Sequence, residues 1–236
     1  MIKFDIVIPT YNEAEYIDDL LSSLYKEKEY INKIIIVDGM SEDDTKRKAF
    51  RYLYHNYSNY NISYEIIDNP KRTTASARDL AMKYVETEYF IQLCAHGYSD
   101  GNLLRACAKN INKYDPKEMG ITIPIVPVGK TWQQKFNAWI LKSKLYNMFG
   151  YGTYNYINHE KGEKVVFNIG ALRKDIFERF HVSDVDCGDD SIMNKRAKEH
   201  GFYARLCKDS KYYVYTRKSI FGFIKQQLEF VMVKFR

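Results

Sequence analysis

The sequence predicts an α/β protein whose mostly parallel sheet is flanked by helices. Short apolar runs at 2–8, 33–37, 64–67 and 89–93 have the length of buried strands. Segments with the helical spacing of apolar residues separate these runs, and the connections are short. Polar or acidic residues follow the runs, which is where an open α/β sheet binds its ligands.

The remaining elements follow in order along the chain. Asn12 and Glu15 have the spacing of a capping box and are expected to begin the first helix. A single helical stripe of Trp132, Phe136, Trp139 and Ile140 is interpreted as core rather than as a binding surface. Helices are expected at 17–24, 44–54, 77–84, 103–111, 132–140, 174–180 and 191–200, strands at 121–128, 165–169, 203–207 and 212–216, and a long loop at 150–163.

Composition narrows the class of protein. The net charge of +6 is too mild, and too little patterned, for a nucleic-acid-binding surface. The four cysteines, at positions 94, 107, 187 and 207, form no CxxC pair, so we expect reduced thiols in a cytoplasmic protein. The first eight residues already have the pattern of a strand, so no signal peptide is expected, and no apolar run approaches membrane-spanning length.

Several common classes of enzyme lack support in this sequence. No glycine-rich phosphate loop, Walker motif or GxSxG elbow is present, which argues against P-loop NTPases and α/β-hydrolases. Four polar clusters lie instead at predicted strand ends or helix starts. These clusters are Thr10-Tyr11-Asn12-Glu13, Asp38-Gly39, Cys94-Ala95-His96 and Asp189-Asp190.

These clusters make the sequence resemble the inverting glycosyltransferases of family 2, which have the GT-A fold. Their order and spacing agree over nearly the whole chain, although each motif alone is weak. The greatest similarity is to the branch that builds bacterial surface polysaccharides, capsules included. The segments that carry the resemblance are 6–13 (IVIPTYNE), 36–45 (IVDGMSEDDT), 69–72 (NPKR), 77–79 (ARD, with Asp79 where Asn is usual), 167–173 (FNIGALR) and 188–196 (GDDSIMNKR).

The resemblance implies a nucleotide-sugar donor, most often a UDP-sugar. It places Tyr11 and Asp38 against the base, and Arg72 and Arg78 near base or phosphate, because aspartate accepts from an imide N–H and arginine pairs with phosphate. Without the resemblance, Asp38 would be interpreted as a turn residue and the arginines as surface charges. The donor-site residues that it implies are Pro9, Thr10, Tyr11, Glu13, Asp38, Arg72, Arg78, Cys94 and Ala95.

The resemblance also implies a catalytic pair, Asp189 and Asp190. The family's E-D pair precedes an arginine by seven and six positions, and Asp189 and Asp190 precede Arg196 by the same intervals. This spacing selects Asp190 as the general base that takes the proton of the acceptor hydroxyl. The alternative interpretation is a helix cap with a flanking acid.

The sequence departs from the family at its DxD motif. Cys94-Ala95-His96 stands at that position, and a thiol cannot replace a hard carboxylate for Mg²⁺. The imidazole of His96 could still ligate a divalent metal, Mn²⁺ more readily than Mg²⁺. The alternative is that His96 is a hydrogen-bonded loop residue, and Asp100 is expected to begin the turn into the next helix.

The expected architecture is one GT-A domain over 1–216, with a nucleotide-sugar-binding half at 1–128 and an acceptor-side half at 129–216. The segment 217–236 has the pattern of a basic amphipathic helix. It either contacts the cytoplasmic face of a membrane or packs on the enzyme's own sheet.

The resulting hypothesis is an inverting transfer of a sugar from a nucleotide-sugar to a saccharide or lipid-linked saccharide. The absent DxD motivates one competitor, a nucleotide-sugar-binding or scaffold protein of the same fold without catalysis. A second competitor is a nucleotidyltransferase, which normally has a glycine-rich basic loop after its first strand. The segment 9–13 (PTYNE) does not fit such a loop.

Overall fold

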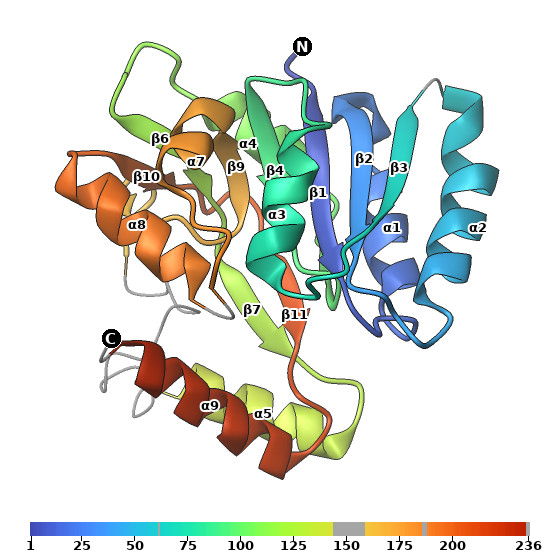
Figure 1. Cartoon of the computed structure of the whole chain (residues 1–236). Coiled ribbons are helices and arrows are strands. Elements are labelled where there is room, and N and C mark those ends of the chain that lie inside the picture. Colours follow the sequence, from blue (N-terminus) through green and yellow to red (C-terminus); the bar gives the residue numbers. More distant parts are fainter. Residues whose placement is uncertain (61, 144–158, 186–187, 235–236) are drawn as a thin grey trace.

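A computed structural model of the chain describes residues 1–60, 62–143, 159–185 and 188–234 (Figure 1). Positions 150–158 of the expected loop, together with Cys187 and Arg236, lie outside the described residues. The strands are β1 (Phe4–Thr10), β2 (Ile31–Asp38), β3 (Ser63–Asp68), β4 (Tyr89–Gln92), β5 (Gly97–Ser99), β6 (Glu118–Thr122), β7 (Ile125–Val128), β8 (Lys164–Val165), β9 (Gly170–Arg173), β10 (Tyr203–Leu206) and β11 (Tyr212–Tyr215). The α-helices are α1 (Ile17–Tyr25), α2 (Thr45–Tyr57), α3 (Thr74–Met82), α4 (Leu103–Asn110), α5 (Trp132–Lys142), α7 (Lys174–Phe180), α8 (Asp189–Glu199) and α9 (Ile220–Lys234).

The main sheet confirms the predicted α/β class. Its eight strands have the order β3-β2-β1-β4-β9-β6-β10-β8. The strands β3, β2, β1 and β4 are mutually parallel, as the alternation of strands and helices predicts, and β9 is antiparallel to both β4 and β6. A second sheet of order β5-β11-β7 lies beyond the end of the first, toward α5 and α9 (Figure 1).

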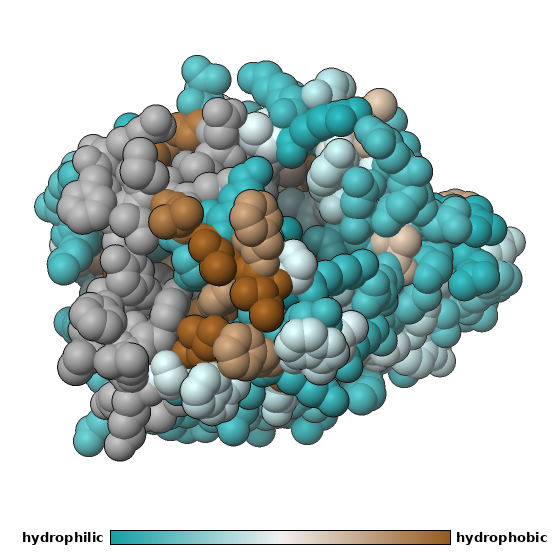
Figure 2. Space-filling view, turned by 90° about the horizontal axis from the view of Figure 1, so that it is seen from below, coloured by the Kyte–Doolittle hydropathy of each residue, from teal (hydrophilic) through white to brown (hydrophobic). Residues whose placement is uncertain are grey.

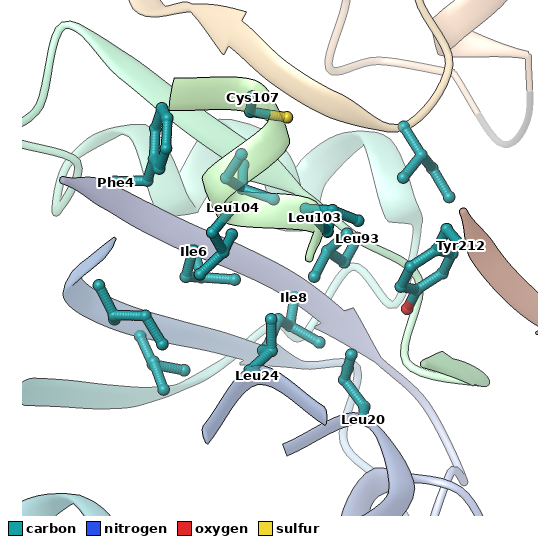
Figure 3. Close-up of a cluster of buried hydrophobic side chains, with 14 of the residues drawn as sticks. Phe4, Ile6, Ile8, Leu20, Leu24, Leu93, Leu103, Leu104, Cys107 and Tyr212 are labelled. Carbon is teal, nitrogen blue, oxygen red and sulfur yellow. The ribbon is translucent and has the colours of Figure 1, made fainter. Parts of the chain in front are cut away.

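Both faces of the main sheet are buried. Along β1, Phe4, Ile6 and Ile8 face one layer, while Val7 faces the other, as the two-residue period of a strand requires. The first layer is formed with α1 and α4, and Figure 3 shows Ile6 and Ile8 among side chains from these helices. The second layer is formed with α3, α7 and α8. Burial on both faces explains why β1 and β2 are mostly apolar, whereas the edge strand β3 is more exposed.

Two predicted strands were placed wrongly. The expected strand 121–128 is divided into β6 and β7, because the chain passes from the large sheet to the small one around Pro124, which has no N–H to donate. The expected strand 165–169 is also wrong. The backbone N–H groups of Phe167 and Asn168 donate to the side chains of Asn194 and Thr122, so β9 begins only at Gly170.

The expected orientation of α5 is wrong as well. Trp132 and Trp139 are 67% and 66% exposed, whereas Gln134 and Asn137 are fully buried. The buried amides have partners that the periodicity could not reveal. Gln134 donates to the backbone oxygen of Thr216, and Asn137 donates to that of Arg217. These bonds orient the helix with its polar face inward.

Among the described residues, none of the helices has both the length and the hydropathy needed to cross a membrane.

Candidate active site

The loops after β1 and β2 are joined by hydrogen bonds around a buried carboxylate. Asp38 ends β2 and is fully buried, and its side chain accepts from the hydroxyl of Thr10 at 3.1 Å. The backbone N–H and the hydroxyl of Ser41 donate to the same carboxylate at 2.8 and 2.6 Å. Asp38 therefore holds the end of β1 and the loop after β2 together, and Pro9 pairs in register with Val37 beside it.

Backbone strain gathers in the three loops that follow β1, β2 and β3. Asn12, Met40 and Arg72 have φ values of 54°, 60° and 60°, the left-handed region that residues other than glycine rarely adopt. The side chain of Asn12 accepts from the backbone N–H of Glu42 at 2.9 Å, which holds one of these strained residues in place. The expected capping box is therefore wrong, and α1 begins after Tyr16 without a side-chain cap. Such strain is found preferentially at functional sites.

An aromatic ring and a guanidinium lie at the exposed edge of these loops. Tyr11 is 44% exposed, and the guanidinium carbon of Arg72 lies 5.8 Å from the centre of its ring. Arg72 also lies 3.6 Å from the carboxylate of Glu42. An exposed ring can stack on a nucleobase, and a guanidinium can pair with phosphate.

His96 has an acidic partner that is distant in the sequence. Its Nδ1 lies 2.9 Å from Oε1 of Glu13, and the backbone oxygen of His96 accepts from the N–H of Tyr215 at 2.9 Å. Both side chains retain access to solvent, 35% for His96 and 17% for Glu13. The loop after β1 thus brings a carboxylate next to His96.

The other residues of the Cys94-Ala95-His96 segment are unsuited to metal binding. Burial raises the pKa of the Cys94 thiol to about 12, which disfavours the thiolate form that metals bind. Ala95 is buried. The carboxylate of Asp100 accepts from the backbone N–H groups of Asn102 and Lys211, as expected for a turn residue.

The residues present fit a divalent metal only in part. Within the described ranges, no group of three or more potential ligands from His, Cys, Asp and Glu is found. The Glu13 and His96 pair offers one carboxylate oxygen and one imidazole nitrogen. That is enough for an ion whose other ligands are diphosphate oxygens and water.

A second acidic cluster surrounds Arg78 on α3. Its Nη1 donates to both Asp189 and Asp190, and its Nη2 donates to Asp190 at 3.2 Å. The side-chain amide of Gln92, at the end of β4, lies 3.4 Å from Asp190. With its oxygen turned toward Arg78, it accepts a hydrogen bond from Nη2 of that residue at 3.0 Å. Arg78, which the resemblance placed near base or phosphate, is thus held by the two acids of α8.

The two acids differ in their environment. Asp189 is 5% exposed, and burial raises its pKa against the lowering effect of Arg78. The side chain of Asp190 is 41% exposed and can meet a second molecule. Asn194, one turn along α8, accepts from the backbone N–H of Phe167 and donates to its backbone oxygen, so the helix is fixed against the segment before β9.

One residue of this cluster has no signal in the sequence. The ring of His181 is buried, with Nδ1 4.0 Å from Asp189 and Nε2 3.1 Å from the backbone oxygen of Ala75. Burial lowers the pKa of His181. A depression of about 360 Å³ is lined by His181 together with residues of α3, of α7 and of the segments that follow them, and includes none of the residues at the strand ends.

The fold brings the Glu13–His96 pair (the first cluster) and the cluster around Arg78 (the second cluster) to one edge of the sheet. Gln92 contacts the second cluster, and His96, four residues later, belongs to the first. Arg72 stands apart from Arg78, beside Tyr11. An exposed carboxylate, a carboxylate–imidazole pair and an aromatic edge can together hold and activate a polar, phosphorylated ligand.

Known proteins resemble the chain in both sequence and fold. TarS of Staphylococcus aureus (strain Mu50), a poly(ribitol-phosphate) beta-N-acetylglucosaminyltransferase, is 28% identical over 118 residues, which is 48% of this chain and 20% of TarS. A Methanococcus voltae protein, a dolichyl N-acetyl-alpha-D-glucosaminyl phosphate 3-beta-D-2,3-diacetamido-2,3-dideoxy-beta-D-glucuronosyltransferase, is 27% identical over 97% of this chain and 72% of its own length.

Solved structures share the fold. The crystal structure of TarS residues 1–349 in complex with UDP-GlcNAc has a TM-score of 0.61 at 18% identity, covering 92% of this chain and 60% of that one. The mannosyltransferase PcManGT of Pyrobaculum calidifontis, in complex with GDP-Man and Mn²⁺, has a TM-score of 0.64 at 18% identity, covering 92% and 57%.

The extent of these matches differs. The chain spans only one fifth of the length of TarS. The family model described as "Glycosyl transferase family 2", by contrast, matches residues 5–180, which is most of the chain. The chain therefore belongs to glycosyl transferase family 2.

Proposed function

We propose that the chain transfers a sugar from a nucleotide-diphosphate donor to a saccharide acceptor with inversion at the anomeric carbon. The observation that carries this proposal is the exposed carboxylate of Asp190, held by Arg78 beside the end of β4 in a chain of this family. A scaffold protein of the same fold would have no need for an exposed acid held in this way.

In the proposed reaction, a hydroxyl of the acceptor loses its proton to Asp190. Its oxygen attacks the anomeric carbon from the face opposite the nucleotide, and the bond from that carbon to the diphosphate oxygen breaks. The nucleoside diphosphate leaves with the electron pair of the broken bond. Arg78 orients the carboxylate of Asp190 through two donors of its guanidinium fork.

Glu13 and His96 would hold a divalent metal at the diphosphate. When bound, such an ion supplies positive charge that stabilises the departing diphosphate. Without an ion, the Glu13 and His96 pair would form part of the pocket wall.

The donor is proposed to be a UDP-sugar, and the acceptor a glycan or a lipid-linked saccharide at the cytoplasmic face of the membrane. The TarS complex with UDP-GlcNAc supports the choice of nucleotide. The names of TarS and of the Methanococcus voltae relative support an acceptor that is part of a larger glycan or glycopolymer. Tyr11 and Arg72 would bind the base and the phosphates.

A thermal-shift panel tests this proposal. We expect a UDP-sugar to raise the unfolding temperature, whereas free sugars leave it unchanged. Ligand at 100 times its Kd adds about 2.7 kcal/mol to the free energy of unfolding. For a chain of this size, each kcal/mol raises the midpoint by roughly 2–4 °C. If UDP, GDP, CMP and dTDP compounds all fail to stabilise the protein, the proposed function is wrong.

A metal arm of the same panel examines the Glu13 and His96 pair. Mn²⁺ is expected to enlarge the shift caused by the donor, and Glu13→Gln should remove that enlargement while retaining the shift without metal. Glu42→Gln is the matched control, because its carboxylate lies at the same edge but pairs with Arg72. A wild-type shift that Mn²⁺ leaves unchanged would refute the metal and leave the donor proposal intact.

A further inference from the structure

The outward face of α5 is apolar and aromatic. Trp132, Phe136 and Trp139 recur at intervals of four and three residues and are 67%, 43% and 66% exposed. The opposite face of the helix buries Gln134 and Asn137. Exposing large apolar side chains to water while burying amides is costly unless something covers the apolar face.

The neighbouring helix α9 also exposes large apolar side chains. Phe221, Ile224 and Leu228 lie on one side of it and are 80%, 50% and 62% exposed, while Phe223 points inward and is 5% exposed. Figure 2, which views the molecule from the side of α5 and α9, shows apolar side chains gathered into one area. We call the six exposed residues the α5–α9 face: Trp132, Phe136, Trp139, Phe221, Ile224 and Leu228.

The two helices are fixed to each other and to the edge of the active site. The side-chain amide of Gln134 donates to the backbone oxygen of Thr216 at 2.9 Å. The hydroxyl of Thr216 in turn donates to the backbone oxygen of Gln134 at 2.8 Å. Gln134 also donates to the hydroxyl of Tyr16, and Lys218 pairs with Glu15 at 2.7 Å. Tyr16 and Glu15 directly follow the loop that carries Glu13. The face is thus a fixed platform next to the candidate active site, at the carboxyl ends of the parallel strands (Figure 1).

The charges along the two helices of the face are mostly positive. The sequence has no Asp or Glu at 129–142 or at 216–228, and Glu229 is the first acid of α9. The cations Lys135, Lys142 and Lys225 are exposed, and none of them forms an ion pair within the ranges that the structure describes. A rim of unpaired cations around tryptophan and aliphatic side chains is the composition of surfaces that lie in the headgroup region of a membrane.

We infer that the α5–α9 face docks on the surface of an anionic lipid bilayer. The aromatic and aliphatic side chains would enter the headgroup region, and the three lysines would lie against lipid phosphates. A second copy of this chain is a poorer occupant, because a two-fold contact through this face would bring Lys135, Lys142 and Lys225 of both copies together, with no acid at 129–142 or 216–228 to balance them. The inference goes beyond the proposed transfer reaction and does not depend on it.

The position of the only two tryptophans of the chain makes the inference directly measurable, because both Trp132 and Trp139 lie on the face. Vesicles that contain phosphatidylglycerol should shift the tryptophan emission to the blue. Vesicles of phosphatidylcholine alone should shift it much less. Replacing Lys135, Lys142 and Lys225 by Gln together should weaken partitioning to the anionic vesicles about tenfold or more, without removing either fluorophore.

Co-sedimentation with the same vesicles provides a second measurement. Phe221→Ser with Leu228→Ser should leave the protein in the supernatant. The matched control, Phe50→Ser with Tyr54→Ser on α2, should still sediment. Those two residues are 53% and 55% exposed, but three of the four Lys and Arg residues of α2, namely Lys46, Arg47 and Lys48, are paired with acids. Circular dichroism establishes that each variant is folded.

Two results would overturn the inference. One is an unchanged emission spectrum and no sedimentation with either kind of vesicle. The other is a blue shift without lipid that grows with protein concentration and accompanies a doubled mass in analytical ultracentrifugation, which would make the face an interface between two copies.

Discussion

Replacing Asp190 by Asn should reduce sugar transfer by about 10²- to 10⁴-fold, the usual contribution of a general base. The substitution preserves the shape of the side chain and its position in the first turn of α8, but it removes the ability to take a proton. The amide can no longer accept two charge-assisted bonds from Arg78. Donor binding should change little, because Tyr11, Arg72 and Glu13 belong to other loops.

The measurement is the rate of nucleoside diphosphate release with acceptor present, together with the donor-induced thermal shift. Asp68→Asn is the matched control, since Asp68 also ends a strand and also pairs with a cation, Lys46. It should retain wild-type turnover. Wild-type turnover in Asp190→Asn would remove Asp190 from the mechanism.

Replacing Arg78 by Met should lower the free energy of unfolding by about 3–5 kcal/mol, the usual effect of removing one partner of a buried ion pair. Asp189 would be left buried without its cation, and Asp190 would lose its orientation, so transfer should fall as well. Chemical denaturation measures the stability. The exposed pair of Arg47 and Asp44 supplies the control, because Arg47→Met should change the free energy of unfolding by at most about 1 kcal/mol.

The pH dependence of Arg78→Met has a definite sign. Burial raises the pKa of Asp189 in the folded protein above its ordinary value of 3.8, and removing Arg78 takes away the group that opposes this shift. The folded variant then binds more protons than the unfolded chain, so its stability is greatest at low pH and is lost as the pH rises through the folded pKa. Relative to wild type, the variant should therefore be least stable near neutral pH. Adding Asp189→Asn should recover part of the loss, and a pH-independent difference would contradict this account.

The parallel half of the fold could be predicted because its signals are local. The apolar runs that became β1, β2 and β4 are bounded by Pro9, Asp38 and Cys94, so both the strands and their polar ends are visible in the sequence. The strand expected at 165–169 failed for a nonlocal reason. The amides of Phe167 and Asn168 donate to side chains from α8 and β6, and nothing in their own sequence indicates that.

For the candidate site, too, the sequence showed the local motifs but not the contacts between distant residues. The sequence placed His96 at a strand end but could not show that Glu13, 83 residues away, faces it. It placed Arg78 and Asp190 in separate motifs, yet they form one ion-paired cluster across 112 residues. For α5, the helical period grouped Trp132 with Trp139 correctly. Only the partners of Gln134 and Asn137 decided which face turned outward.

The central claim is an inverting transfer with Asp190 as base, and its most direct test is the anomeric configuration of the product. The protein is incubated with an α-linked UDP-sugar of gluco or galacto configuration that stabilises it in the thermal-shift panel. Saccharide and lipid-linked saccharide acceptors are supplied, and the anomeric proton of the new linkage is followed by NMR. We expect a β-linked product from the wild type and none from Asp190→Asn. An α-linked product, or a β-linked product formed equally well by the variant, would contradict the claim.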